Sequence, residues 1–273
     1  MLRMESENGW WLITHPDHAY LAGAFASHWG NKRFVRPEPH KNVLDGIHVH
    51  DDGWAARDAR PSITRQGKPS AFSQELVGKY SAFEEIDLAD YLAVRECAVE
   101  KVESRDSYAA LLVSMHTYNL LSERADRSTI APDQLPLLDA FLERQLLRQE
   151  RLRAAIRSDA QFSPAEVTDD SIADNFRLLQ ATDNLSLLSC VASMQPSTLL
   201  HPMRTTDGSA SAIAVQPLAP RSFRLAPYPF DEPALTFHVP ARHVEGKLFA
   251  SSEELATRFA AAEVEMLTIT VSG

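Results

Sequence analysis

The chain has 273 residues, of which 44% are hydrophobic, so it can bury a full core and needs neither a disulfide nor a structural metal to fold. Its formal net charge is −10, and its 27 Lys and Arg residues are scattered along the chain instead of forming a basic stripe. This distribution argues against nucleic-acid binding. It leaves small anionic substrates open, because a bound cation can reverse the local potential of an acidic protein.

The cysteines and the apolar runs indicate the compartment. Cys97 and Cys190 are the only cysteines, and both lie in helix-like apolar stretches, as expected of reduced core thiols. Residues 1–11 lack the basic start and apolar run of a signal peptide, and no later stretch approaches about 18 uninterrupted apolar residues. We therefore expect a cytoplasmic protein without a membrane segment. The oligomeric state stays open, with a homodimer as one alternative.

The first 195 residues carry mostly helical patterns. Thr14 and Pro16 suit the cap and first turn of an early helix, and Gly53 suits the end of the second helix. In chain order we expect a strand over 9–14, a helix to about residue 29, a Pro-rich linker at 36–39, a helix over 41–51, a turn-rich segment over 55–73 that could cover a site, and helices over 87–103, 106–124, 132–157 and 169–192.

After Pro196 the sequence pattern changes: prolines become frequent and separate short β-prone runs. These runs lie at 212–215, 223–225, 235–239 and 266–271, with one helix near 251–262. The sequence thus predicts a mainly α protein, with a helical bundle over 1–195 and a small α+β appendage over 196–273 packed on it. Glycine-rich phosphate loops and internal repeats are missing, which argues against dinucleotide and P-loop functions.

Several polar side chains interrupt the apolar faces of the predicted helices. Asp183 lies on the same stripe as Leu179 and Leu187, where an unpaired carboxylate would cost several kcal/mol or become protonated. An arginine could satisfy that acid alone, and a lone buried histidine is commonly a satisfied core residue. The whole set is more economically explained by one divalent cation. Its members are His18, His50, Asp51, His116 and Asp183.

These residues also carry a family resemblance. An early histidine, a His-Asp doublet that closes a helix and a distant aspartate on a late helix follow the order seen in the HD-domain superfamily, which the chain resembles. The local sequences Asp17-His18-Ala19, His50-Asp51-Asp52-Gly53-Trp54 and Asp183-Asn184-Leu185-Ser186-Leu187 are similar to an uncharacterised bacterial domain-of-unknown-function family. This second likeness covers nearly the whole chain.

The HD-domain resemblance implies an HD-like helical bundle and a ligand set. His18, His50, Asp51 and Asp183 would be metal ligands, and His116 would be an added ligand or a catalytic histidine. Such mixed imidazole and carboxylate donors suit one or two ions of Mn, Fe, Ni, Co or Zn, which would activate a water molecule.

Other polar residues near the doublet are candidates for roles around the metal. Asp52 or His48 could be the general base, and His48 could instead orient Asp51, although surface or capping roles stay open for both. Asp58 could accept a proton or bind substrate. Lys68 and Arg57, in the following loop, could meet an anionic substrate or simply be solvated.

Three functions follow as hypotheses. The first is a metal-dependent hydrolase, in particular a phosphohydrolase of a nucleotide or another small phosphate ester, as the HD resemblance implies. The second is a di-iron oxygenase on a similar helical scaffold, which the extra His116 favours. The third is a non-catalytic sensing or assembly module with a degenerate or structural site.

Overall fold

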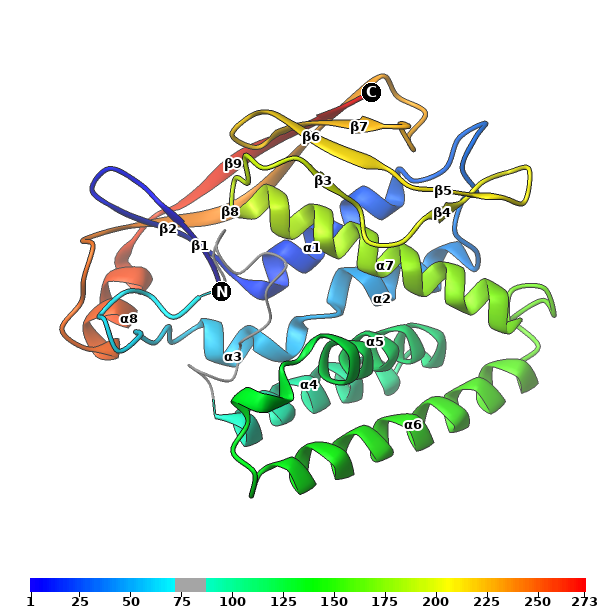
Figure 1. Cartoon of the computed structure of the whole chain (residues 1–273), viewed down its shortest axis with the longest axis horizontal. Coiled ribbons are helices and arrows are strands. Elements are labelled where there is room, and N and C mark those ends of the chain that lie inside the picture. The colour runs from blue at the N-terminus through cyan, green and yellow to red at the C-terminus, as the bar shows by residue number, and fades with distance from the viewer. Residues whose placement is uncertain (72–86) are drawn as a thin grey trace.

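The computed structural model describes residues 1–71 and 87–273 (Figure 1). The helices are α1 (His15–Ser27), α2 (His40–Val49), α3 (Ala55–Asp58), α4 (Leu88–Glu103), α5 (Ser107–Asn119), α6 (Leu135–Ser158), α7 (Asp169–Cys190) and α8 (Ser252–Ala261), with 3-10 turns η1 (Asp52–Trp54) and η5 (Arg127–Thr129) and a π-helical turn η4 (Leu120–Arg124). The strands are β1 (Leu2–Glu5), β2 (Gly9–Ile13), β3 (Ser197–Thr198), β4 (Met203–Arg204), β5 (Ala210–Ser211), β6 (Ala214–Ala219), β7 (Ser222–Ala226), β8 (Ala234–Glu245) and β9 (Val264–Ser272).

The long helices begin and end close to the expected residues, because local signals mark their ends. The Oγ1 of Thr14 caps α1 by accepting the main-chain N–H of Asp17 at 3.1 Å, and Pro16 lies in the first turn. Asp87 and Asp106 cap α4 and α5 in the same way. The turn-rich segment expected over 55–73 begins with α3 and is irregular to residue 71; its last two residues lie outside the described residues.

The expected mainly α architecture is wrong. Seven strands form one mixed sheet in the order β1-β2-β8-β9-β7-β6-β3, in which only β7 and β9 pair in parallel, and β4 and β5 form a second, two-stranded sheet. The N-terminal strand β2 pairs with β8 near the C-terminus, with Trp10 opposite Val244. Local periodicity does not encode such long-range pairing. The boundary proposed at residue 195 stays a prediction, but strands from both sides of it share this sheet.

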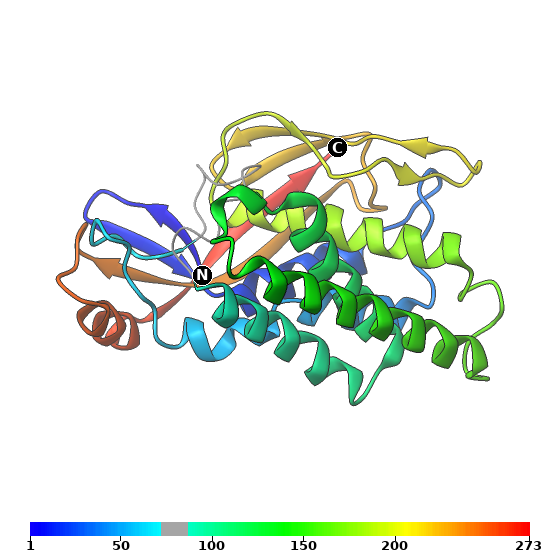
Figure 2. The ribbon, with the colours of Figure 1, turned by 60° about the horizontal axis from the view of Figure 1, so that its bottom comes forward.

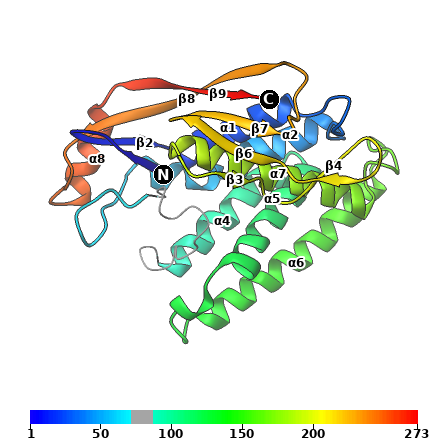
Figure 3. The ribbon, with the colours of Figure 1, turned by 45° about the horizontal axis from the view of Figure 1, so that its top comes forward.

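The sheet covers one side of the helices. In all three views α1 and α7 lie next to the sheet, and α4, α5 and α6 lie on the side away from it (Figures 1, 2 and 3). Phe25 of α1 contacts Phe237 of β8 edge to face, with ring centroids 4.7 Å apart. One apolar core therefore joins the inner helices to the strands. Within the described ranges, the helices are all too short or too polar to cross a membrane.

Candidate metal centre

Four helices bring the five sequence-predicted ligands together. His18 comes from α1, His50 caps the C-terminus of α2 with Asp51 next to it, and α5 and α7 supply His116 and Asp183. Each is buried, with no more than 6% of its surface exposed. Candidate ligand atoms gather within 4.8 Å in two groups that share His50: one with His18 and Asp51, the other with His116 and Asp183. These buried groups can hold a metal ion.

The hydrogen bonds of His18 leave a lone pair facing a carboxylate. The hydroxyl of Ser186 donates to the main-chain oxygen of Asp183 at 2.8 Å, so its oxygen accepts the Nδ1–H of His18, 2.9 Å away. In a neutral imidazole, Nε2 is then an acceptor, and it lies 3.1 Å from Oδ2 of Asp51. Two acceptors at this distance require a proton or a cation between them.

His50 and His116 also present buried ring nitrogens that form no hydrogen bond within residues 1–71 and 87–273. Nδ1 of His50 donates to the main-chain oxygen of Ile47 at 2.8 Å, which leaves Nε2 as the acceptor in the neutral ring. That atom lies 3.4 Å from Oδ1 of Asp183 but makes no hydrogen bond with a described residue, and Nδ1 of His116 is likewise buried without a hydrogen-bond partner among them. A histidine whose second nitrogen is held by a carbonyl is the usual arrangement of a metal ligand.

Arg95 of α4 binds the other oxygen of the Asp51 carboxylate. Its Nη1 donates to Oδ1 of Asp51, and its Nε donates to the hydroxyl of Tyr91 at 3.1 Å. The guanidinium lies over the rings of Trp54 and Tyr91, 5.5 and 5.2 Å from their centroids. Arg95 thus fixes the Asp51 carboxylate and leaves only Oδ2 to face His18.

The charges of the cluster shift the pKa values of its members. Burial lowers the pKa of His50, but Asp51 and Asp183 outweigh it and raise the pKa to about 9. Burial favours the neutral form of both carboxyls, but Arg95 holds the pKa of Asp51 well below its usual range, and His50 lowers that of Asp183 to about 2. Burial lowers the pKa of His116 to about 3, so it is neutral. With His50 neutral, two carboxylates face one arginine, and the excess negative charge is balanced either by a proton on His50 or by a bound cation.

The donor set fits a divalent transition metal. His18, His50 and His116 offer imidazole nitrogens, and Asp51 and Asp183 offer carboxylate oxygens, a mixture that suits Mn, Fe, Ni, Co or Zn. Protons alone satisfy the cluster less well. They would place imidazolium ions on the rings of His18 and His50, whose centroids are 5.4 Å apart, and would still leave the neutral His116 without a partner. A cation held at His50, which both groups share, can take the place of these protons.

The turn after the His-Asp doublet is fitted closely to α4. A Cβ atom added at Gly53 would lie 2.1 Å from the main-chain oxygen of Val94 and 2.9 Å from the main-chain nitrogen of Ala98. Only glycine allows this approach, which places Asp51 against Arg95 in the same turn of α4.

Gly53→Ala is therefore expected to destabilise the protein by about 1–3 kcal/mol, because backbone atoms of α4 must move to admit the methyl group. Urea unfolding of the metal-free protein measures this loss. Ala56→Ser, at an exposed position in α3, is the control and should change stability by less than about 0.5 kcal/mol. Equal stability of the two variants would contradict the tight fit of the turn.

Two predicted catalytic residues lie beside the cluster but are not members of it. The ring of His48 contacts Tyr20, with centroids 4.9 Å apart, and fills the space above Gly23 of α1, so it packs on that helix and not on Asp51. Asp52 is half-buried, its main-chain oxygen accepts a hydrogen bond from Nζ of Lys101 at 3.1 Å, and burial raises its pKa.

The three predicted substrate-binding residues also lie outside the cluster. Asp58 is buried and committed to other partners: it accepts the main-chain N–H of His15 at 2.6 Å and binds the amino group of Met1 at 2.9 Å. Arg57 pairs with Asp90 at 3.6 Å. Lys68 is partly exposed, and its main-chain N–H donates to Thr64.

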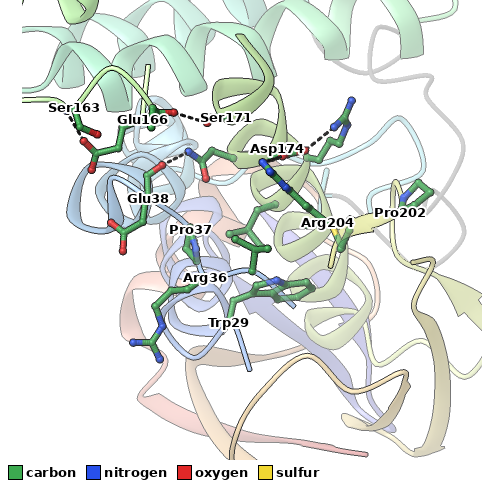
Figure 4. A pocket seen from close by; sticks show the side chains of 16 residues that line it. Trp29, Arg36, Pro37, Glu38, Ser163, Glu166, Ser171, Asp174, Pro202 and Arg204 are labelled. Atoms are coloured by element: carbon green, nitrogen blue, oxygen red, sulfur yellow. Dashed lines mark hydrogen bonds and ion pairs between the residues drawn. The ribbon is translucent and has the colours of Figure 1, made fainter. Parts of the chain in front are cut away.

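A separate pocket of about 500 Å³ lies away from the cluster, between the segment around Arg36 and Glu38, the N-terminal part of α7 and β4 (Figure 4). Asp174 binds Arg177 at 2.7 Å and Arg204 at 3.1 Å there. Its lining contains none of the five candidate ligands.

Sequence reasoning missed two residues that position the ligands. Arg95 shares a helix face with Leu92 and Val99, so it breaks an apolar stripe in the same way as the predicted ligands do. Ser186, three residues after Asp183, is fully buried between two ligands. The same search for buried polar positions would have found Arg95.

Comparison with known proteins gives a family without an assigned activity. Searches of the curated proteins and of the solved structures found no match. The model of one family, described as "Protein of unknown function (DUF3891)", matches residues 1–246. Because the match spans most of the chain and includes all five candidate ligands, the protein belongs to the DUF3891 family.

Proposed function

We propose that the protein is a metal-dependent hydrolase that cleaves a small phosphate ester or a nucleotide at an HD-like centre. The observation that carries the proposal is the pair of facing acceptors, Nε2 of His18 and Oδ2 of Asp51, 3.1 Å apart in a buried cluster. A divalent ion bound there supplies Lewis acidity and lowers the pKa of a water molecule.

The protein's own residues would hold the ligands and move the proton. Ile47 and Ser186 fix the rings of His50 and His18, and Arg95 fixes the carboxylate of Asp51. Asp52 follows the Asp51 ligand directly, and its raised pKa brings it closer to the value that a base needs at neutral pH. We propose Asp52 as the residue that takes the proton of the attacking water.

Three observations bear on the alternative, a di-iron oxygenase. His116 belongs to the cluster, as that alternative requires. However, Arg95 occupies Oδ1 of Asp51, so this carboxylate has only one oxygen to offer and is poorly suited to bridge two ions. His50 likewise offers a single nitrogen to the two groups that share it. Both features favour one ion, and therefore hydrolysis over di-iron chemistry.

We expect the purified protein to release phosphate or p-nitrophenol from a panel of p-nitrophenyl phosphate, bis-p-nitrophenyl phosphate and nucleoside phosphates. EDTA should abolish this activity, and Mn, Co, Ni, Zn or Fe should restore it, because the ion supplies the activated water. Asp183→Asn is the matched variant that should remain inactive after metal is added.

Oxygen uptake by an iron-loaded sample would instead favour the oxygenase. A metal-loaded protein that cleaves none of these esters would contradict the phosphohydrolase proposal. Cleavage that is insensitive to EDTA would contradict the role of the metal.

A further inference from the structure

A second polar layer lies directly beside the candidate metal centre. Nε2 of Gln180 in α7 donates to Oδ1 of Asn119 in α5 at 2.6 Å. Gln180 precedes Asp183 by three residues, and Asn119 follows His116 by three. Residues at this spacing share a helix face and are offset by about 4.5 Å along the axis. The pair is therefore the layer next to His116 and Asp183 between the same two helices.

This layer continues to the protein surface. Because the amide nitrogen of Gln180 donates to Asn119, its Oε1 is the acceptor for Nε2–H of His201, 2.7 Å away. Gln180 is only 2% exposed, whereas His201 is exposed. His201 has φ of +65°, a left-handed backbone conformation that is strained for a residue with a side chain and that clusters at ligand-binding sites. Hydrogen-bonded side chains thus lead from the surface to the layer beside the metal centre.

Two arginines lie near His201, where this series of hydrogen-bonded side chains reaches the surface. Arg124, the last residue of the π-helical turn that follows Asn119, makes no hydrogen bond or ion pair with any residue of the described ranges. Arg177, one turn before Gln180, is bound to Asp174. Burial lowers the pKa of His201, and both arginines lie near enough to lower it further. In a protein with a net charge of −10, a guanidinium that no described residue pairs with is available at this place to an anion.

We propose that Arg124, Asn119, Gln180 and His201 form a substrate subsite that binds a phosphate group of the substrate next to the metal centre. This inference rests on the proposed function. It specifies which residues bind the phosphate group of the substrate and from which side the substrate approaches the metal centre. Arg124 supplies the charge, the Nδ2 amide of Asn119 supplies a further donor, and Gln180 and His201 hold that amide in place. The π-helical turn, a feature frequent at functional sites, sets the position of Arg124.

The test is binding of inorganic phosphate to the full-length protein, measured by isothermal titration calorimetry, with metal content determined on the same samples. Arg124→Gln is expected to weaken phosphate binding by about ten- to a hundredfold, because it removes a charge-assisted hydrogen bond. Arg127→Gln is the control, since Arg127 is also on the surface but is paired with Asp139 at 2.7 Å, and it should bind phosphate as the wild type does. The affinity of His201→Gln for phosphate should lie between those of Arg124→Gln and Arg127→Gln.

The titration requires no turnover, so it separates this proposal from the proposed function. Weaker binding in Arg124→Gln supports the subsite even if the protein hydrolyses nothing. Phosphate binding that is unchanged in Arg124→Gln, or that is absent in the metal-loaded wild type, would overturn the subsite and leave the metal centre intact. A protein without metal would instead contradict the hydrolase.

Discussion

Arg95→Met is expected to destabilise the metal-free protein by about 3–5 kcal/mol, because it leaves the buried carboxylate of Asp51 without its cation. The guanidinium also packs over Trp54 and Tyr91, and methionine keeps much of this apolar contact. The expected loss is therefore mainly electrostatic. Urea or thermal unfolding in the presence of EDTA measures it.

Two further variants separate this charge effect from a loss of packing. Arg95→Met combined with Asp51→Asn should recover most of the lost stability, because no unpaired charge remains. Arg127→Met, which breaks an exposed pair with Asp139, should cost less than about 1 kcal/mol. A loss of the same small size for Arg95→Met would mean that Asp51 does not depend on Arg95.

His50→Ala is expected to weaken metal binding by more than about 100-fold, since loss of a residue that merely orients a ligand already costs about 10–100-fold. At a metal concentration about 1,000 times the wild-type dissociation constant, the ion should stabilise the wild type by about 4 kcal/mol and the variant by less than about 1.5 kcal/mol. The shift of the unfolding midpoint on adding metal measures this difference.

Asp183→Asn and His28→Ala complete that comparison. The first keeps the shape of a ligand that lies 3.4 Å from His50, so it should disturb folding less than His50→Ala does and should still lose the metal-induced shift. The second removes a partly exposed histidine paired with Glu232 and should keep the full shift. Equal shifts in all of these proteins would mean that the ion binds elsewhere.

The sequence predicts the candidate ligands and the helices better than it predicts the assembly. Asp183 and His18 are visible because a polar group on an apolar stripe is a local signal, and the cap at Thr14 is likewise local. The sheet depends on pairs such as Trp10 with Val244, whose partners nothing in either segment specifies. The short apolar runs near the C-terminus therefore suggested a small appendage, where the structure has the centre of a seven-stranded sheet.

The polar layer beside the candidate metal ligands is harder to predict for a similar reason. His201 contacts Gln180 only because a loop with a left-handed residue crosses α7 at that place, and the position of this loop depends on the whole fold. Asn119 and Gln180 carry the same local signal as Asp183, a polar residue within a helical apolar pattern, but their pairing requires the antiparallel packing of α5 and α7.

The most direct test of the metal centre is the metal content of wild-type protein purified without chelator, measured by inductively coupled plasma mass spectrometry beside His50→Ala and Asp183→Asn. We predict about one transition-metal ion per wild-type chain and nearly none in either variant, because His50 belongs to both groups of donors and Asp183 is the carboxylate of the group with His116. A wild-type protein that holds no metal, even after reconstitution with Mn, Fe, Co, Ni and Zn, would contradict the centre. The cluster would then be a network of buried charges balanced by protons and Arg95.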